Sequence, residues 1–385
     1  MDKVRLGIVG IGNMGSSHSR KLIDGEVENG VLVAVCDIKE ERLKWAKENL
    51  GDDILTFDSI DAMIESGECD ALIIATPHYN HPTMGIQTLK AGLHVLVEKP
   101  IGVYTKAVEE LNKVAAVSDK VFTVMYNQRT NPLYQKVKEM VDGGELGEIM
   151  RVNWVITNWF RTERYYESGG WRATWKGEGG GVLLNQCPHQ IDLIQWLCGL
   201  PKRVRAFAKY GQYHNIEVED DVTAYFEYEN GATGTFITST GETPGTNRLE
   251  ITGENGKLVV EGGKLTFYKN EVSMYKYSKT TDELFKKPEV EVKEIEVFGK
   301  MTAHVGIMQN FVNAILKNEK QLAPGIEGIN GLSLSNAMHM SSWIDDWVDL
   351  PIDGSRYKEL LDEKINNSVY KKVTKEVTAD LTGSH

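Results

Sequence analysis

The sequence lacks the features of two common kinds of protein, disulfide-rich domains and membrane proteins. Its 385 residues include only four cysteines, and no two of them stand at the Cys-x-x-Cys spacing typical of structural zinc sites. We therefore predict no disulfide framework and no metal site, and we expect a reducing compartment, the cytoplasm. No run of about 18 apolar residues is present, so no membrane-spanning segment is predicted.

Positive charge is also scarce, and this bears on the choice of partner. Lysine and arginine number 43 against 55 aspartates and glutamates, which gives a net charge of −12. Nucleic acids and anionic membranes are bound by basic faces, so we expect neither as the main partner. The N-terminal segment MDKVRLGIVGIG has a short apolar run that glycines interrupt, which indicates a buried strand rather than a signal peptide.

The first third of the chain alternates short apolar runs with helix-forming segments such as Glu40–Asn49 and Ala107–Val117. Continuous apolar strands separated by helices predict a parallel sheet that helices cover on both faces. The predicted strands are Val4–Val9, Val31–Cys36, Ala71–Ala75, His94–Val97 and Val121–Met125. These elements make up a first predicted domain, residues 1–126.

The pattern changes from about residue 150, where hairpin signals replace the alternation of strands and helices. Asn-Gly pairs at 230–231 and 255–256 each separate two β-prone runs, and both central residues of such a turn need positive φ. A further run follows Gly262-Gly263. These signals predict a mostly antiparallel sheet in a second domain, residues 127–385. Two late helices are predicted to pack back on the first domain, one within 326–348 and one with its apolar face formed by Met308, Phe311, Val312, Ile315 and Leu316.

A glycine-rich turn follows the first predicted strand. Residues Gly10-Ile11-Gly12-Asn13-Met14-Gly15 form the pattern G-x-G-x-x-G and lead into a predicted helix. The first glycine permits a tight turn, the second lets the backbone approach a pyrophosphate, and the third allows the helix to pack closely on the strand. The helix N-terminus adds free N–H groups and the positive end of its dipole. All six residues are therefore predicted to bind a dinucleotide.

Asp37 ends the second predicted strand and lies 22 residues after Gly15. A carboxylate at this place accepts hydrogen bonds from the ribose hydroxyls and repels a 2′-phosphate. The two residues that follow it are Ile38 and Lys39, so no arginine directly follows Asp37 to bind a 2′-phosphate. NAD is therefore favoured over NADP as the cofactor.

Glu98-Lys99-Pro100 is one of several motifs that follow each other along the chain in the order seen in a known family. The sequence resembles the Gfo/Idh/MocA oxidoreductases, the glucose–fructose oxidoreductase and inositol dehydrogenase group, over almost its whole length. The other matching segments are Gly10–Gly15, Ala75-Thr76-Pro77 with His81, Gly179–Gly181 leading into His189 and Asp192, and Ile326–Pro351. The resemblance implies an α/β fold with an N-terminal Rossmann domain and a C-terminal α/β domain built on a large, open, mostly antiparallel sheet.

The resemblance also implies an activity and an assembly. Members of the family transfer hydride between a secondary alcohol of a sugar or cyclitol and NAD(P). A small-molecule sugar or polyol is therefore the expected substrate, and a homodimer or homotetramer formed through the C-terminal sheet is the expected assembly.

A lysine and a histidine are the predicted catalytic pair. Lys99 follows a predicted strand, where ligands of a parallel sheet bind, and its ammonium could stabilise a developing alkoxide. His189 is the predicted base, because an imidazole titrates near neutral pH. The family commonly carries an aspartate at the position of Asn185, and an amide there can orient a hydroxyl but cannot take its proton. Asp192, three residues after His189, could fix the histidine tautomer if both are helical, or it could serve as a buried polar support.

Further contacts are predicted around this pair. Residues 154–175 hold four of the eight tryptophans, interleaved with arginines, and aromatic faces pack well on the C–H faces of sugars. Arg129 is predicted to lie near the cofactor, with a purely structural role left open. The predicted cofactor contacts, besides the glycine turn and Asp37, are Thr76, Pro77, His81, Glu98, Lys99, Asn127 and Arg172. The predicted substrate contacts are Lys99, Asn158, Tyr165, Trp171, Arg172, Asn185 and His189.

Three functions remain open from the sequence. The leading hypothesis is an NAD-dependent dehydrogenase of a sugar, glycoside or cyclitol, and residues 161–192 look most like members that oxidise glucosides or anhydrosugars, often at the 3-hydroxyl. A second is a glycosidase of the same fold that oxidises transiently, eliminates the aglycone and returns the hydride, with no net NADH. A third is a non-catalytic NAD-binding regulator, against which the presence of Lys99 and His189 argues.

Overall fold

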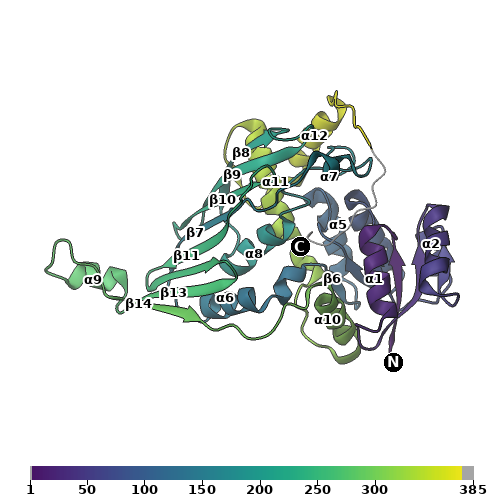
Figure 1. Ribbon diagram of the computed structural model, residues 1–385, viewed down its shortest axis with the longest axis horizontal. Helices are drawn as coiled ribbons and strands as arrows, with labels where there is room; N and C mark the ends of the chain where they lie inside the picture. Colours follow the sequence, from purple (N-terminus) through teal and green to yellow (C-terminus); the bar gives the residue numbers. More distant parts are fainter. Residues whose placement is uncertain (1, 375–385) are drawn as a thin grey trace.

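The computed structural model describes residues 2–374, which form two sheets at opposite sides of an elongated molecule (Figure 1). Met1 and residues 375–385, which are the outer ends of the two predicted domains, lie outside the described residues.

The first sheet is parallel and has the order β3-β2-β1-β4-β5-β6. Its strands are β1 Val4–Val9, β2 Gly30–Cys36, β3 Leu55–Phe57, β4 Ala71–Ile74, β5 His94–Val97 and β6 Phe122–Val124. The helices between them are α1 Asn13–Ile23, α2 Glu40–Leu50, α3 Ile60–Glu65, α4 His81–Lys90 and α5 Thr105–Ala116, with a short η1 His78–Asn80. This order is that of a Rossmann domain, whose ligands bind beyond the carboxyl ends of the strands. The predicted parallel sheet is confirmed; β3 was not predicted, since three partly exposed residues give no apolar run.

The second sheet has the order β14-β13-β12-β11-β7-β10-β9-β8-β15. Its strands are β7 Ile149–Ile156, β8 Arg203–Tyr210, β9 Glu219–Glu227, β10 Thr233–Ser239, β11 Asn247–Gly253, β12 Gly256–Glu261, β13 Lys264–Asn270, β14 Val290–Ile295 and β15 Val348–Asp349. Its accompanying helices are η2 Asn127–Thr130, α6 Pro132–Asp142, α7 Glu163–Glu167, α8 Pro188–Cys198, α9 Met274–Thr280, α10 Ala303–Lys317, η3 Gly325–Glu327, α11 Gly328–Ile344 and α12 Gly354–Asn366. Neighbouring strands are antiparallel except β7 and β10, so the sheet is mostly antiparallel, as predicted.

The hairpins occur where the sequence predicted them, but the turn geometry predicted for the Asn-Gly pairs is wrong. Among residues 2–374, neither Asn230 nor Asn255 has positive φ. At the second pair Gly253 pairs with Gly256, so the loop is 254–255 and the glycine already belongs to β12. The turn with positive φ at both central residues is Gly262-Gly263, with values of 57° and 76°. Two glycines adopt that geometry without steric cost, and this turn matches the twist of the flanking strands.

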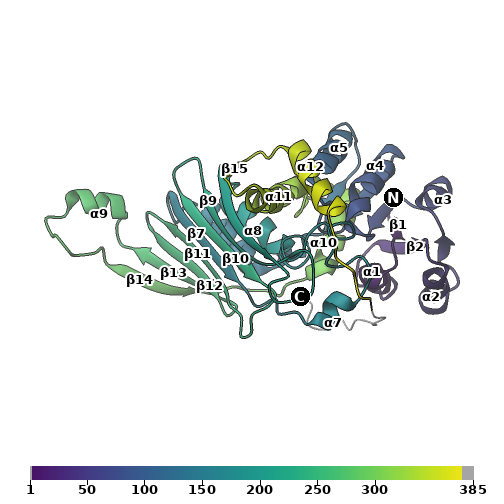
Figure 2. The ribbon, with the colours of Figure 1, turned by 90° about the horizontal axis from the view of Figure 1, so that it is seen from above.

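Helices α6, α8 and α11 lie against one face of the second sheet (Figures 1 and 2), and among residues 2–374 no helix packs on the opposite face. Burial alternates along β9, where every second residue from Val222 to Phe226 is buried and those between them are exposed. This alternation is typical of an antiparallel sheet with one face on the core and one toward solvent.

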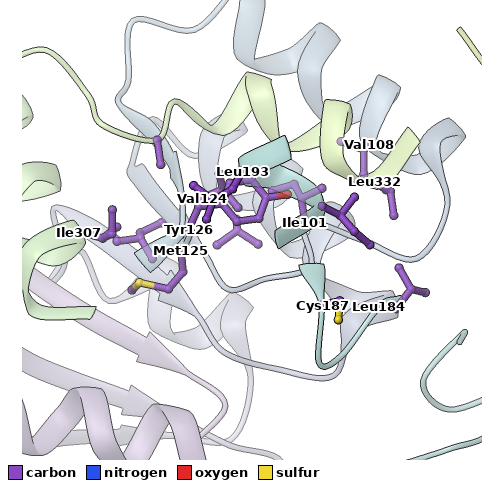
Figure 3. Close-up of a cluster of buried hydrophobic side chains, with 14 of the residues drawn as sticks. Ile101, Val108, Val124, Met125, Tyr126, Leu184, Cys187, Leu193, Ile307 and Leu332 are labelled. Atoms are coloured by element: carbon purple, nitrogen blue, oxygen red, sulfur yellow. The ribbon is translucent and has the colours of Figure 1, made fainter. Parts of the chain in front are cut away.

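A shared hydrophobic core joins the two sheets. Figure 3 shows Tyr126, two residues after the end of β6, with Leu193 of α8, Ile307 of α10 and Leu332 of α11. All four are nearly or fully buried, and full burial of such a side chain stabilises the fold by about 1.5–3 kcal/mol.

The late helices also contact the first sheet domain through polar bonds. Asn336 of α11 accepts a hydrogen bond from the Thr105 N–H and donates one to Val103 O, and Gln309 of α10 bonds the backbone of Glu28. In the part of the chain that the structure describes, no helix is both long and apolar enough to cross a membrane.

Candidate active site

The glycine turn between β1 and α1 forms a backbone cradle. A Cβ on Gly15 would lie 1.9 Å from Gly10 O, so only glycine allows this close packing. A Cβ on Gly12 would meet nothing within 4 Å, which leaves open space beside the turn. No side chain caps the helix at Gly12 and no acidic residue lies in its first turn, so its N–H groups face that space. These features fit the pyrophosphate of a dinucleotide.

Asp37 lies beside this turn, as predicted for a ribose-binding carboxylate. Its Oδ2 accepts the Ile11 N–H at 2.8 Å and its Oδ1 accepts the Lys39 N–H at 3.0 Å. Each carboxylate oxygen has a further lone pair, so a ribose hydroxyl can still donate to this group. The residues present therefore fit NAD at both of its anchoring points.

Thr76, Pro77 and His81 follow β4, at the carboxyl edge of the first sheet. Thr76 is partly exposed and Pro77 exposed, so both are open to a ligand at this edge. The buried His81 has its ring nitrogens 2.7 Å from Thr76 O and 2.7 Å from Pro100 O. It therefore ties the end of β4 to the segment after β5, and its predicted cofactor contact stays a prediction.

Glu98 and Asn127 also face inward. The Glu98 carboxylate lies 2.6 Å from Nε2 of His18 on α1 and accepts the Lys99 N–H. Burial alone would raise the pKa of Glu98, but His18, with the nearby His304 and Lys99, lowers it to about 2. Asn127 places its amide 3.2 Å from Nε2 of His304. The cofactor contacts expected of these two residues remain predictions. Glu98 links α1 to the backbone of Lys99, and Asn127 contacts His304 of α10.

Lys99 of the first domain reaches the second domain. Its Nζ donates to Asn185 O at 3.0 Å, across a sequence separation of 86 residues. Burial lowers the pKa of this ammonium below its ordinary value, and the positive charges of Arg172 and Arg161 act in the same direction. The carboxylates of Glu98 and Glu178 oppose that shift. An ammonium with a lowered pKa shares its proton more readily than an exposed lysine does.

His189 lies in the first turn of α8 and is 9% exposed. Its ring makes an edge contact with Tyr126, with centroids 6.3 Å apart. Leu184 and Cys187, on either side of Asn185, are buried in the core and hold this stretch of backbone in place (Figure 3).

Asp192 has a partner other than the one predicted. Its two oxygens accept from Nε and Nη2 of the buried Arg129, at 2.8 and 2.7 Å. This ion pair ties α8 to η2, whereas the tautomer-fixing role toward His189 stays a prediction. For Arg129, the structural role is the one the geometry shows.

The aromatic segment divides between core and site. Trp154, Tyr166 and Trp175 are buried. Tyr165 is partly exposed, and the guanidinium carbons of Arg172 and Arg161 lie 4.3 and 5.2 Å from its ring centroid.

Two other predicted substrate contacts lie on either side of this group. Trp171 makes an edge contact with His78, at 5.3 Å between centroids, which brings the aromatic segment to the carboxyl edge of the first sheet. Asn158 is exposed beyond β7, and its predicted substrate contact stays a prediction.

One residue at the centre of this arrangement was missed. Glu178 is 1% exposed, and its carboxylate accepts hydrogen bonds from the Asn185 side-chain amide and the Ala173 N–H. Its sequence signal was a single acidic residue immediately before three glycines, a place where charge is otherwise unexpected. Among residues 2–374, no group of three or more metal-ligating side chains is close enough to hold a metal ion.

Comparison with known proteins agrees with this geometry. A family model described as the oxidoreductase family with an NAD-binding Rossmann fold matches residues 4–126, and one described as the GFO/IDH/MocA C-terminal domain matches residues 134–259. The chain is 32% identical over 203 residues to the rhizopine catabolism protein MocA of Rhizobium meliloti, a match that covers 52% of this chain and only 58% of that protein.

Two further proteins extend the comparison. The chain is 24% identical over 271 residues to the myo-inositol 2-dehydrogenase of Thermotoga maritima, covering 68% of this chain and 77% of that protein. A crystal structure of the WlbA dehydrogenase from Bordetella pertussis, in complex with NADH and UDP-GlcNAcA, matches at a TM-score of 0.76 and 27% identity. That match covers 91% of this chain and all of the other.

Proposed function

The chain belongs to the Gfo/Idh/MocA family of NAD-dependent oxidoreductases, and on this basis we propose that it oxidises a secondary hydroxyl of a sugar, glycoside or cyclitol. The glycine turn Gly10–Gly15 and Asp37 would hold the dinucleotide. When bound, NAD supplies the hydride acceptor.

In the proposed reaction, two residues handle the proton and the charge of the substrate hydroxyl. His189 takes the proton as general base, and Lys99 hydrogen-bonds the same oxygen and stabilises its negative charge. The lowered pKa of Lys99 suits this role, because a more acidic ammonium makes a stronger hydrogen bond to a developing alkoxide. The observation that carries the proposal is the bond from Lys99 Nζ to Asn185 O at 3.0 Å, since it joins Lys99 to the segment that leads into His189.

The substrate class is inferred from the groups around this pair. Tyr165 and Trp171 offer aromatic faces for the C–H surface of a ring, and Arg172 and Asn185 offer hydrogen bonds for its hydroxyls. The names of the relatives, an inositol dehydrogenase and a dehydrogenase bound to a nucleotide sugar, support a cyclitol or sugar. The 3-hydroxyl of a glucoside is the position we propose for oxidation within this class.

The test is a panel of inositols, free sugars and glycosides, each incubated with NAD or NADP while NADH or NADPH absorbance is followed. We expect at least one polyol to reduce NAD, and Lys99→Ala to lower kcat by about 10³-fold. NADH binding, measured by fluorescence, should survive that substitution. Failure of every polyol, sugar and glycoside to reduce NAD would contradict the proposal.

Analysis of products separates the dehydrogenase from a glycosidase of the same fold. A glycoside that releases its aglycone without net formation of NADH would favour the glycosidase. An oxidised glycoside formed together with NADH would favour the dehydrogenase.

We also propose that a second copy covers the open face of the large sheet. Phe207 of β8 is 56% exposed and Tyr225 of β9 is 38% exposed on this sheet, although both are large and apolar. Light scattering should give the mass of a dimer or tetramer, and a monomer at all concentrations would contradict this.

A further inference from the structure

Glu178 is a buried carboxylate in the loop that precedes α8. One of its oxygens accepts from the Asn185 side-chain amide and the other from the Ala173 N–H. Among residues 2–374, the cation within 4 Å of it is Arg172, whose Nη1 lies 3.9 Å from the first oxygen. Glu178 thus has two hydrogen-bond donors but only a distant ion pair.

Burying a carboxylate in this way costs stability. Burial raises the pKa of Glu178, and Arg172, Ala173 and Asn185 counter only part of that rise. A glutamine would fill the same space without the cost of desolvating a charge. Fold stability alone therefore does not account for the charge at this position, which points to a role in the chemistry.

The residue bonded to Glu178 also contacts Lys99. The Asn185 side-chain amide donates to Glu178, and the Asn185 backbone carbonyl accepts from Lys99 Nζ. An ionised carboxylate can only accept hydrogen bonds, so it fixes the amide nitrogen toward itself and turns the amide oxygen away. A nearby backbone contact, from Glu178 O to His78 Nδ1 at 3.3 Å, ties this loop to the carboxyl edge of the first sheet.

We propose that Glu178 is the positioning carboxylate of the reaction centre: it fixes the Asn185 amide with its oxygen toward the substrate hydroxyl and supplies the negative charge that balances Lys99 and Arg172. The orienting part of this proposal rests on the proposed oxidation of a hydroxyl. The electrostatic part concerns only the residues of the chain and can be tested without a substrate.

The charges that face Lys99 define the electrostatic prediction. Glu98 and Glu178 favour its charged form, whereas Arg172 and Arg161 disfavour it. The buried His78 and His81 also lie within electrostatic range of this ammonium. Since Glu178 is the acidic group that the second domain contributes to this set, its removal should make Lys99 easier to deprotonate.

The experiment is an NMR titration of Lys99 after ¹³C reductive methylation, with Lys99→Arg used to assign the resonance. Glu178→Gln should lower the titration midpoint of Lys99 by about one pH unit, because an opposite charge is lost. The exchange variant Glu178→Gln/Asn185→Asp moves the carboxylate to the other end of the same hydrogen bond. It should return the titration midpoint of Lys99 most of the way to its native value. Glu217→Gln is the matched control, because Glu217 also accepts a backbone N–H of this loop, that of Trp175.

Each outcome decides the question. An unchanged Lys99 midpoint in Glu178→Gln, or no recovery in the exchange variant, would overturn the proposal. If Glu178→Gln alone does not fold, the exchange variant still tests it, since a near-native Lys99 midpoint supports the proposal and a displaced one refutes it. If Glu217→Gln shifted the Lys99 midpoint as much as Glu178→Gln does, the shift would reflect only a general loss of negative charge. That result would also refute the proposal.

A kinetic readout then tests the orienting role on any polyol that reduces NAD in the substrate panel. Glu178→Gln should lower kcat by about 10- to 100-fold without changing KM for NAD, and the exchange variant should regain at least part of the loss. If no polyol reduces NAD, the proposed function is refuted. The Lys99 titration needs no substrate, so it still tests the electrostatic part of the Glu178 proposal.

Discussion

The cofactor turn and the reaction centre of this chain are built in different ways. The turn consists of consecutive residues, Gly10–Gly15, and presents backbone N–H groups at the start of α1. The proposed reaction centre takes Lys99 from the first domain and Glu178, Asn185 and His189 from the second, and the side chains of Lys99 and Glu178 both bond Asn185. One site is therefore local and made of backbone, whereas the other depends on tertiary contacts.

This difference bears on which substitutions each site should tolerate. A backbone cradle keeps its shape as long as its φ and ψ angles are allowed, so it should be insensitive to changes elsewhere. A centre assembled from two domains depends on the groups that hold those domains in register. Three further predictions test this contrast, from the largest expected effect to the smallest.

The largest effect is expected at Arg129, whose ion pair with Asp192 ties η2 to α8, the helix that carries His189. Arg129→Met leaves Asp192 buried without its cation and should lower the free energy of unfolding by about 3–5 kcal/mol. Urea denaturation measures the loss, and NADH fluorescence should show that the cradle still binds. Arg203→Met is the control, since Arg203 pairs with Glu227 on the sheet surface and should cost less than about 1 kcal/mol. Equal losses in both variants would argue against the contrast.

Glu98 is a link between the two sites, because it bonds His18 of α1 and the backbone N–H of Lys99. Its pKa falls from an ordinary 4.5 to about 2, so its stabilising effect is full above pH 4.5 and lost as the pH falls through 2. Glu98→Gln should therefore cost up to roughly 3 kcal/mol at neutral pH. That difference from the native chain should shrink as the pH is lowered from 4.5 toward 2.

Urea denaturation at neutral pH and at about pH 3 measures this dependence on Glu98. Glu65→Gln changes an exposed glutamate at the end of α3 and should alter the free energy of unfolding by less than about 0.5 kcal/mol. A Glu98→Gln penalty that is the same at both pH values would show that the carboxylate is not held in its charged form.

The smallest effect in free energy is expected at Gly12, where binding and folding should separate. Gly12→Ala places a methyl group in open space, so the thermal midpoint should stay unchanged while the affinity for NADH falls about 10- to 30-fold. Isothermal titration with NADH and a thermal melt measure the two quantities. Gly15→Ala is the contrasting variant, because its Cβ would lie 1.9 Å from Gly10 O, and it should lower the thermal midpoint. Loss of stability in Gly12→Ala would contradict the idea of an open cradle.

Much of the first domain was predictable because its signals are local. Continuous apolar runs identified five of its strands, and the glycine pattern predicted a turn beside which the structure places Asp37. The exceptions were short or weakly patterned: β3 has three residues, and its neighbours give no run of apolar residues. In the second domain, the Asn-Gly pairs located the hairpins but not the turn register, since either residue of the pair can belong to a strand.

The reaction centre was predictable only in part. Lys99, Asn185 and His189 were proposed from family motifs, and the structure joins Lys99 to Asn185, but nothing in the sequence paired Asp192 with Arg129 or Glu178 with Asn185. Neighbouring aromatics in one segment also divided between core and surface without a periodic pattern to separate them. Their packing partners lie on distant elements, so the local sequence does not determine which of these rings are buried in the core and which are exposed.

The sequence by itself therefore determined the parallel sheet, the dinucleotide turn and the preference for NAD, because each depends on residues close together in the chain and on backbone geometry. The tertiary structure decided which polar groups meet: Glu98 with His18, Arg129 with Asp192, and Glu178 with Asn185 beside Lys99. The physical reason is that a buried charge is stable only with partners, and those partners are brought together by the packing of the two domains rather than by their spacing in the chain.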